Sequence, residues 1–531
     1  MSAPKVAYFC MEFGLESDFK IYSGGLGILA GDILKAAKDI NAPMVGVGIL
    51  WRAGLTDQYI DKNGFPYDSY YDYRYDFLKD TGVTVEVKIK DDTVKLKVWK
   101  CDILGNVPLY LLDPFLPDNP HSLICGNLYG WFDEERIAQE IILGIGGYKA
   151  LKALGEKVDI YHFNDSHPLF CATEIIKDYM TAQNMSFSEA RAAARKNIVF
   201  TTHTPVPAGN EVHGHKVLDY MDAYNGLTKE QMTDIGGDPF GMTVAGLRTA
   251  KIANSVAELH CNTANKMWTD VKDAAVITNV TNGVHNKTWQ SSQIKEAYLS
   301  NGDLYSIHQI LKQKMIDEIY KRNGVKLLLD VPTIGFAKRA APYKRGDLIF
   351  RDKAIIEPLL KEKKLQIIFA GKSHPNDYTG KNIIKNLFDM AKRYPESVVF
   401  LQNYDMHIGA MMTRGCDIWL NNPIRPLEAC GTSGMKAAMN GVLNFAVLDG
   451  WWPEGCVHGV NGWQIGDGYE GAGCDEHDSK ALYKCLTQEV LPTYQDKIKW
   501  AGMMRESIAM SDVKFSAQRM VKEYYEKIYS Y

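Results

Sequence analysis

The stretch Thr333-Ile-Gly-Phe-Ala337-Lys338-Arg339-Ala-Ala-Pro-Tyr343-Lys344-Arg345 joins a short apolar run to a loop that carries four cations. A short apolar run that ends at polar residues is typical of a strand buried in a sheet. Similar runs occur at 6–10, 158–161, 197–200, 366–370 and 397–401, and longer amphipathic stretches such as 134–154 and 307–322 lie between them. This alternation predicts an α/β protein with mainly parallel sheets, whose functional residues collect beyond the carboxyl ends of the strands.

The length of the chain predicts two domains. A sequence of 531 residues is too long for one hydrophobic core, since single cores stop growing below about 300 residues. A fresh strand signal follows the turn Asn279-Val-Thr-Asn-Gly-Val-His285 and a long helical region. We therefore expect domains at 1–285 and 286–531, with the cleft between them as the default site and a terminal helix over 515–531.

Composition excludes several classes of protein. The formal net charge is -4 and the basic residues are scattered, so the stripe expected of a nucleic-acid binder is missing. We also expect no secretion signal and no membrane span, because neither pattern occurs in the sequence. The ten cysteines are spaced singly, which favours buried thiols in a reducing cytoplasm.

A glycine-rich loop, Tyr22-Ser23-Gly24-Gly25-Leu26-Gly27, precedes a predicted helix over 28–40. Backbone N–H groups at such a helix start are open to an anion, and the helix dipole favours negative charge. A tight strand-to-helix turn without a ligand is the alternative interpretation.

The cations after the 333–337 run are the second candidate for an anion site. Arg339 could offer a planar fork to a phosphate and Lys344 a point charge. A surface cluster of charges is the alternative, although its place after a strand favours function.

The run Glu428-Ala-Cys-Gly431-Thr432-Ser433-Gly434-Met435-Lys436 is the third candidate. Its Gly/Thr/Ser turn could cap a helix that begins near Met435, with Lys436 on the first turn. A lysine near a helix N-terminus and other cations loses its proton more readily, and the neutral amine is the form that makes a Schiff base. An exposed lysine on the first turn is the alternative.

Two polar turns follow other strand-like runs, Asn164-Asp165-Ser166-His167 and Thr201-Thr202-His203-Thr204-Pro205. A lone histidine after a strand is more often structural than catalytic, so His203 gains weight only together with the other candidates.

These motifs together resemble the glycogen and α-glucan phosphorylase family, in particular its short microbial branch. The resemblance runs through nearly the whole chain and includes the segments 8–14, 21–27, 200–209, 281–285, 369–372 and 431–441. It implies two Rossmann-like domains that face each other across a cleft, the GT-B architecture, with a C-terminal helix that returns to the first domain. It also implies reversible, retaining phosphorolysis of terminal α-1,4-glucosyl units of glycogen or maltodextrin to α-glucose 1-phosphate by a cytoplasmic homodimer.

The resemblance also implies roles for individual residues. Lys436 matches the lysine that holds pyridoxal 5'-phosphate, whose phosphate group rather than its aldehyde serves the reaction. The residues expected around that phosphate are Gly24, Gly25, Lys338, Thr432 and Ser433. Arg339 and Lys344 are expected to meet the substrate phosphate. The glucosyl unit is expected against Leu26, His203 through its backbone carbonyl, Asn282, Glu428, Ala429, Cys430 and Gly431. No metal is expected.

Some positions depart from the long-chain phosphorylases. Ala340-Ala341 stands where those proteins carry His-Glu, and Ser433-Gly434 stands where they carry Gly-Asn; no role can be carried over to Arg425. Two alternatives therefore stay open. One is a glycogen-synthase-like transferase that uses a nucleotide sugar, and the other is a catalytically silent glucan-binding protein on the same fold.

Overall fold

The computed structural model describes residues 3–130, 132–206 and 209–530, which form two compact units. The first unit is Met1–Leu55, Tyr70–Thr281 and Met520–Tyr531, and the second is Thr56–Ser69 and Asn282–Arg519. The segment Thr56–Ser69 therefore belongs to the second unit although it falls within the range 1–285. Hydrogen bonds explain this, because Gln58 Nε2 donates to Ser373 O (3.2 Å) and Lys381 Nζ lies 2.6 Å from Asp68 Oδ2.

The first unit is built on a nine-stranded sheet of order β13-β12-β9-β8-β1-β2-β7-β6-β5. Pairs from β13 to β7 are parallel, and β6 and β5 extend the sheet as an antiparallel edge. The strands are β1 (Val6–Phe9), β2 (Met44–Ile49), β5 (Lys79–Ile89), β6 (Asp92–Cys101), β7 (Leu109–Asp113), β8 (Ile160–Asn164), β9 (Ile198–Thr201), β12 (Ile252–Ser255) and β13 (Ile277–Asn279). A separate two-stranded sheet joins β10 (Val212–His213) and β11 (Phe240–Gly241).

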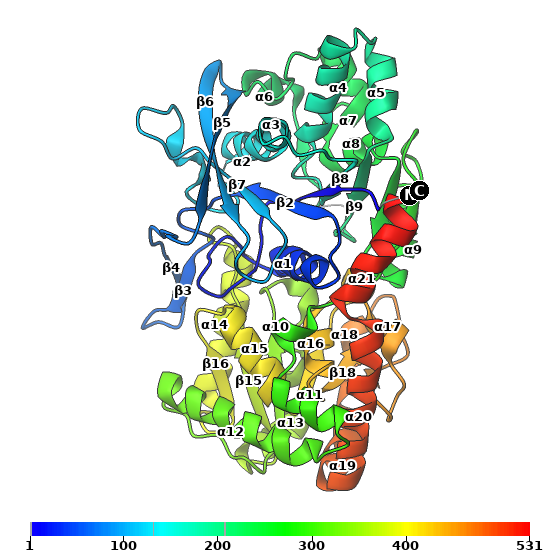
Figure 1. Cartoon of the computed structure of the whole chain (residues 1–531). Coiled ribbons are helices and arrows are strands. Elements are labelled where there is room, and N and C mark those ends of the chain that lie inside the picture. The colour runs from blue at the N-terminus through cyan, green and yellow to red at the C-terminus, as the bar shows by residue number, and fades with distance from the viewer. Residues whose placement is uncertain (1–2, 131, 207–208, 531) are drawn as a thin grey trace. The chain divides into compact units, whose positions relative to one another are not determined.

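Helices cover both faces of this sheet (Figure 1). A side chain at Gly46 would meet Leu34 of α1, whereas the next residue, Val47, packs against Gly147 of α3; adjacent strand residues point to opposite faces. The helices of this unit are α1 (Gly25–Asp39), α2 (Asp133–Ile141), α3 (Gly147–Ala153), α4 (Phe170–Ala182), α5 (Phe187–Arg195), α6 (His215–Tyr220), α7 (Lys229–Gly236), α8 (Met242–Thr249) and α9 (Glu258–Met267). A π-helical turn, η2 (Ile142–Gly146), joins α2 to α3. The helical stretch predicted at 134–154 is therefore one continuous helical segment with a π-helical turn in its middle.

The second unit is built on a six-stranded parallel sheet of order β16-β15-β14-β17-β18-β19. Its strands are β14 (Thr333–Ala337), β15 (Gln366–Ala370), β16 (Val398–Leu401), β17 (Ile418–Asn421), β18 (Leu443–Val447) and β19 (Gly462–Ile465), with a small hairpin of β3 (Asp57–Ile60) and β4 (Pro66–Ser69). The order of the strands reverses between β14 and β17. Ligands of open α/β sheets bind at such a reversal, beyond the carboxyl ends of the strands.

Two apolar layers pack this sheet. Phe336 and Phe369 belong to one buried cluster, and Ile368 and Trp419 belong to another. The helices are α10 (Asn286–Trp289), α11 (Ser292–Leu299), α12 (Leu304–Asn323), α13 (Lys353–Lys361), α14 (Tyr378–Arg393), α15 (Met406–Gly415), α16 (Ser433–Ala438), α17 (Trp452–Gly455), α18 (Cys474–Cys485), α19 (Leu491–Gln495) and α20 (Lys497–Lys514). The chain ends with α21 (Ala517–Glu523) and the π-helical η7 (Tyr524–Tyr529).

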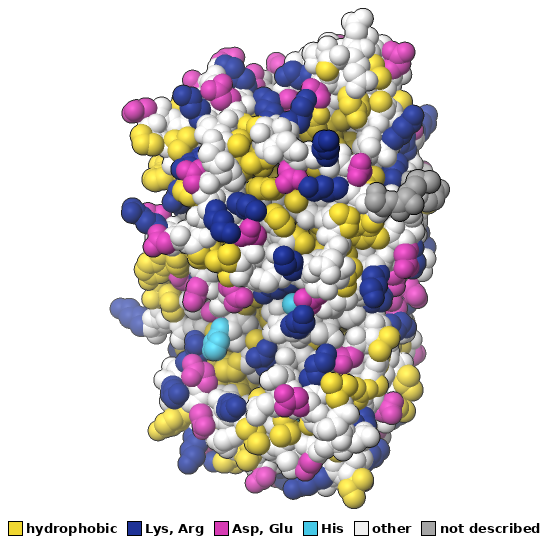
Figure 2. Space-filling view, in the orientation of Figure 1, with side chains coloured by type: hydrophobic (Ala, Val, Ile, Leu, Met, Phe, Trp, Pro, Cys, Tyr) yellow, Lys and Arg dark blue, Asp and Glu magenta, His cyan; other side chains and the backbone are white. Residues whose placement is uncertain are grey.

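The surface agrees with the composition. Lys and Arg side chains are interspersed with Asp and Glu on the face in Figure 2 rather than gathered into a stripe. Among the described residues, no helix combines the length and the apolar character that crossing a membrane requires.

Candidate active site

Two lysines of the loop after β14 meet residues of the loop after β17. Lys338 Nζ donates to Ser433 Oγ (3.0 Å), and Lys344 Nζ donates to Glu428 Oε2 (2.6 Å). Ser433 Oγ also accepts a hydrogen bond from Trp419 Nε1 (3.1 Å). Four residues expected at the site on sequence grounds therefore lie together at the carboxyl ends of two neighbouring strands.

Lys436 lies on α16 in the same part of the unit and is buried, with 7% of its surface exposed. Its Nζ is 3.6 Å from the ring centroid of Trp289, which places the amine against an aromatic face. The alternative of an exposed lysine is therefore wrong. The predicted cap is also wrong, because α16 begins at Ser433 and neither Thr432 nor Ser433 caps it with a side-chain hydrogen bond.

Gly434 is required by packing rather than by flexibility. A Cβ at this position would lie 2.6 Å from Asn444 Oδ1 and 3.0 Å from the Trp451 ring. Asn444 Nδ2 also donates to the Gly434 carbonyl (2.9 Å). This departure from the long-chain sequences is thus accommodated by the strand β18 behind the helix.

The cluster has more positive than negative charge. Burial, together with the nearby charges of Lys344 and Lys436, lowers the pKa of Lys338 to about 7. Burial acts to raise the pKa of Glu428, but the charges of Lys344 and Lys338 outweigh it and lower that pKa. Three lysines, of which Lys338 and Lys436 are buried and Lys344 is partly buried, against one carboxylate make a cluster that attracts anions. The donor set, with a lysine amine against an aromatic ring, fits a phosphate-bearing aldehyde such as pyridoxal phosphate.

The four cations of the loop after β14 separate into two groups. Lys338 and Lys344 point to the cluster, and Arg339 is exposed but near enough for its charge to lower the pKa of Glu428. Arg345 is buried elsewhere and lies 2.6 Å from Asp478 Oδ2 and 3.0 Å from Asp475 Oδ1. Arg345 is thus a structural residue that fixes the loop to α18.

Polar atoms near the carboxyl end of β17 support a ligand role. Within the described part of the chain, the side-chain oxygens of Asn282, Asn421 and Asn422 are buried without a hydrogen-bond partner. Cys430 is buried, and Ala429, Gly431 and Thr432 are partly buried. The buried Asp449 accepts the backbone N–H of Glu428 (2.9 Å), which positions that residue. Burial raises the pKa of Asp449 to about 7.

The glycine loop of the first unit is organised by Glu12, which follows β1. Glu12 Oε2 accepts the N–H groups of Ser23 (2.5 Å) and Gly24 (3.0 Å), and Oε1 accepts the hydroxyl of Tyr129 (2.5 Å). A Cβ at Gly27 would lie 2.5 Å from Glu12 Oε2. Two backbone donors expected to face an anion are therefore already bound to a carboxylate. The N–H groups of the first turn of α1 have no partner within the helix.

His203 is held by its neighbour on β8. Its Nε2 is hydrogen-bonded to Asn164 Oδ1 (2.5 Å), and burial lowers the pKa of His203 to about 3. The ring is neutral at physiological pH and its Nε2 is engaged. Leu26 lies on the first turn of α1 and is partly buried.

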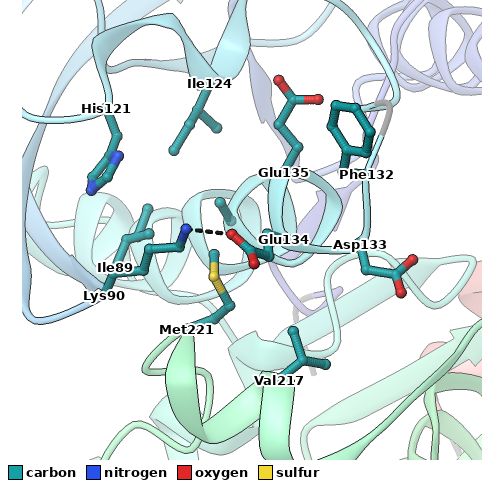
Figure 3. Close-up of a pocket in the computed structure, with 11 residues that line it drawn as sticks. Ile89, Lys90, His121, Ile124, Phe132, Asp133, Glu134, Glu135, Val217 and Met221 are labelled. Carbon is teal, nitrogen blue, oxygen red and sulfur yellow. Dashed lines mark hydrogen bonds and ion pairs between the residues drawn. The ribbon is translucent and has the colours of Figure 1, made fainter.

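A separate hollow on the first unit has a volume of about 730 Å³. Figure 3 shows its wall, with the ion pair of Lys90 and Glu134 across it and Phe132 at its rim. The side chains that line it are Ile89, Lys90, His121, Ile124, Phe132, Asp133, Glu134, Glu135, Ala138, Val217 and Met221. None of the predicted site residues is among these.

Sequence reasoning missed four contributors to the two clusters, namely Glu12, Tyr129, Trp289 and Asp449. Glu12 was noted only as part of a motif. Tyr129, Trp289 and Asp449 belong to none of these motifs, so only their spatial contacts identify them.

Comparisons with known proteins find similarity to phosphorylases. A family model described as carbohydrate phosphorylase matches residues 293–452, the range that contains β14, β17 and α16. Maltodextrin phosphorylase of Thermococcus litoralis is 37% identical over a 587-residue alignment that covers 99% of this chain and 70% of that protein. Because the alignment is longer than this chain, the relative carries internal segments that this chain lacks.

Two further relatives cover the chain almost completely. Glycogen phosphorylase of Aquifex aeolicus is 34% identical over 99% of this chain and 86% of that protein. An uncharacterized protein of Methanocaldococcus jannaschii is 36% identical over 98% of this chain and 99% of that protein. The chain therefore belongs to the glycogen and α-glucan phosphorylase family of glycosyltransferase enzymes.

Proposed function

We propose that the protein is an α-glucan phosphorylase that transfers terminal α-1,4-linked glucosyl units reversibly to phosphate, with pyridoxal phosphate bound to Lys436. The observation that carries this proposal is a cluster of three lysines beside Glu428. Lys338 and Lys436 are buried and close enough for their charges to interact, and the partly buried Lys344 is paired with Glu428. The names of the relatives, maltodextrin phosphorylase and glycogen phosphorylase, support the choice of substrate.

The cofactor would be held by residues on both sides of the β14–β17 reversal. The Lys436 amine would form the covalent link, Trp289 would face the ring, and Lys338 and Ser433 would bind the phosphate, with Thr432 beside them. Bound there, pyridoxal phosphate supplies a phosphate group that exchanges a proton near neutral pH, since the second pKa of such a group is about 6.

The substrate phosphate needs cations of its own because two phosphates side by side repel each other. Lys344 and Arg339 would supply them. Glu428, held through its backbone by Asp449, would keep Lys344 oriented before the substrate arrives and accept a hydrogen bond from a glucosyl hydroxyl. Asn282 and the backbone of Ala429, Cys430 and Gly431 would contact the same sugar.

In the first unit, we propose that the loop of Gly24, Gly25 and Leu26 serves the same reaction through the backbone N–H groups of Gly25 and Leu26, while the N–H of Gly24 stays bound to Glu12 and holds the loop in place. His203 would act through its backbone carbonyl on the positive charge that grows on the sugar. The neutral ring, which is already bonded to Asn164, supports a role for the carbonyl rather than for the imidazole.

Two assignments at the level of the cell belong to the same proposal, namely a homodimer and a cytoplasmic location. Light scattering on the purified protein would test the first, and fractionation of cells that express it would test the second.

One assay tests the function directly. Purified protein is incubated with maltodextrin and inorganic phosphate, with and without added pyridoxal phosphate, and glucose 1-phosphate is measured. We expect production that Lys436→Ala abolishes and that Lys480→Ala, on an exposed side chain of α18, leaves unchanged.

Other outcomes separate the alternatives. Full turnover by a cofactor-free Lys436→Ala protein would refute the site. Glucosyl transfer that requires a nucleotide sugar would identify a synthase-like enzyme. A folded protein that binds maltodextrin, takes up pyridoxal phosphate and produces no glucose 1-phosphate would identify a glucan-binding protein without activity.

A further inference from the structure

Four acceptor atoms converge next to α2 in the first unit. They are both carboxylate oxygens of Glu140, Oε2 of Glu211 and Nε2 of His213. Within 3–130, 132–206 and 209–530 none of these atoms has a hydrogen-bond partner, and one ligand atom from each residue lies within 4.8 Å of the others. Buried acceptors are normally satisfied, so this convergence needs an explanation.

Burial makes the cluster costly as it stands. The side chain of Glu140 is fully buried and that of His213 is 5% exposed. Burying an ionised carboxylate without a partner is expensive, and the group then takes up a proton or a cation.

Arg136 is the arginine that lies beside the carboxylates of Glu140 and Glu211. Arg136 Nη2 lies 2.6 Å from Glu211 Oε1, whereas its Nε is 3.7 Å from Glu140 Oε1. Asp165 adds further negative charge, because it acts to raise the pKa of Glu140. Three carboxylates around one guanidinium leave a charge that a divalent ion would balance.

The chemistry of the donors identifies the type of ion. The imidazole of His213 lies with its Nε2 3.5 Å from Glu140 Oε2, and a neutral imidazole is a common metal ligand. One imidazole and two carboxylates suit transition metals such as Zn²⁺ or Mn²⁺. The Glu211 side chain is 28% exposed and gives the ion a way in from solvent. We propose that Glu140, Glu211 and His213 bind a divalent transition-metal ion.

The position of this site suggests a bracing role. The Arg136 guanidinium lies 4.5 Å from the ring centroid of Tyr129, whose hydroxyl donates to Glu12 (2.5 Å). Glu12 in turn holds the backbone of Ser23 and Gly24. The metal would thus fix α2 against β10 and the residue before it, Glu211, and through Arg136 and Tyr129 it would support the glycine loop without touching substrate.

The experiment measures metal binding and stability rather than turnover. The protein is treated with a chelator, desalted and titrated with Zn²⁺ or Mn²⁺ by calorimetry, and bound metal is counted by mass spectrometry after gel filtration. We expect one equivalent per chain and a rise in melting temperature of several degrees. His213→Gln and Glu140→Gln should each lose that equivalent and the thermal shift.

A matched control separates this site from a partly exposed group of similar composition, His458, Cys485 and Glu489. His458→Ala should keep the bound equivalent. Wild-type protein that binds no metal, or His213→Gln protein with wild-type stoichiometry, overturns the proposal. A melting temperature that is insensitive to chelator but raised by Glu140→Gln would show instead that Glu140 and Glu211 share a proton.

Discussion

Lys344 Nζ lies 2.6 Å from Glu428 Oε2, and Lys338 is close enough to lower the pKa of the same carboxylate. Glu428 is thus the negative group within an otherwise cationic pocket. It orients Lys344, but it also opposes any anion that enters. Glu428 therefore has two opposite effects: it holds the Lys344 side chain in one orientation in the free protein, and it lowers the affinity of the site for phosphate.

Glu428→Gln should raise the affinity of the protein for phosphate. Removing a negative charge a few ångströms from the bound anion should tighten binding of inorganic phosphate by about tenfold, or ~1.4 kcal/mol. Turnover should fall, because Lys344 and the sugar lose an ionic partner. Calorimetric titration of the holoenzyme with phosphate measures the first effect. Glu470→Gln, at the exposed partner of Arg425, should leave the affinity unchanged, and weaker phosphate binding by Glu428→Gln would contradict the argument.

Lys338 should make the stability of cofactor-free protein depend on pH. Its pKa in the folded protein is about 7, below the value of about 10.4 for a free lysine. Between these values the unfolded chain binds one more proton, so the free energy of unfolding should rise with pH, by up to ~1.4 kcal/mol per unit. Below pH 7 the group carries a proton in both states and the slope vanishes.

Denaturant titrations at pH 7, 8 and 9 measure this slope. Lys338→Met should remove it, because the methionine does not titrate, whereas Lys480→Met should keep it. Saturation with pyridoxal phosphate should also flatten the curve if the bound phosphate holds Lys338 protonated. Equal slopes in wild-type and Lys338→Met protein would disprove the assignment of the pKa.

The sequence predicted the strand that precedes Lys338 and Lys344, but not the strand Ile418–Asn421 that precedes Glu428. Only the family resemblance assigned all three residues to one site. Both loops follow buried apolar strands, and the carboxyl ends of parallel strands share one edge of a sheet; the strand at Gln366–Ala370 is likewise confirmed to the residue. The position of the two lysines beyond the end of a strand follows from a pattern that the sequence carries locally. The function of the lysine on α16 came from resemblance to a family rather than from any pattern.

Other features depend on partners far along the chain. Arg345 stands one residue from Lys344 but turns to Asp475 and Asp478, about 130 residues away, and no local pattern distinguishes the two cations. The predicted cap of α16 failed because Thr432, at the N-cap position, has helical backbone angles and makes no side-chain cap hydrogen bond, while the Ser433 hydroxyl accepts hydrogen bonds from Lys338 and Trp419. Tertiary contacts decide such cases, and a single sequence does not display them.

Lys312 should be a strong determinant of stability in the second unit. Its side chain is fully buried, its Nζ lies 2.6 Å from Asp417 Oδ2, and His308 binds the other oxygen of Asp417 (3.0 Å). Asp417 Oδ2 also accepts the N–H of Thr333 and so ties β14 to β17. Lys312→Met leaves a buried carboxylate short of a partner, which should cost about 3–5 kcal/mol in the free energy of unfolding.

An exposed ion pair provides the comparison for Lys312. Lys363 and Glu396 lie 3.1 Å apart with side chains 42% and 71% exposed, so Lys363→Met should change stability by less than ~1 kcal/mol. Chemical denaturation of both variants measures the difference. Similar small losses in the two proteins would mean that Asp417 finds another partner when Lys312 is removed.

Gly25 and Gly27 should respond to alanine in opposite ways. Among the described atoms, a Cβ at Gly25 would have no neighbour within 4 Å, and alanine favours the helix that starts there. Gly25→Ala should therefore fold with unchanged or higher stability. If the loop has the proposed role, the kcat/KM of this variant for phosphorolysis should still fall by about 100-fold or more, because a methyl group at Gly25 would keep a phosphate from the backbone N–H groups.

Gly27→Ala should instead damage the fold of the loop. Its Cβ would lie 2.5 Å from Glu12 Oε2 and 2.9 Å from Glu12 Cγ, so Glu12 must move and release the N–H groups of Ser23 and Gly24. Overpacking of this kind costs about 1–3 kcal/mol. Chemical denaturation and initial rates measured on the two variants separate the effects. We expect Gly25→Ala to be stable but inactive and Gly27→Ala to be destabilised. An active Gly25→Ala enzyme would remove the loop from the phosphate site, because the open space at that position would then serve no ligand.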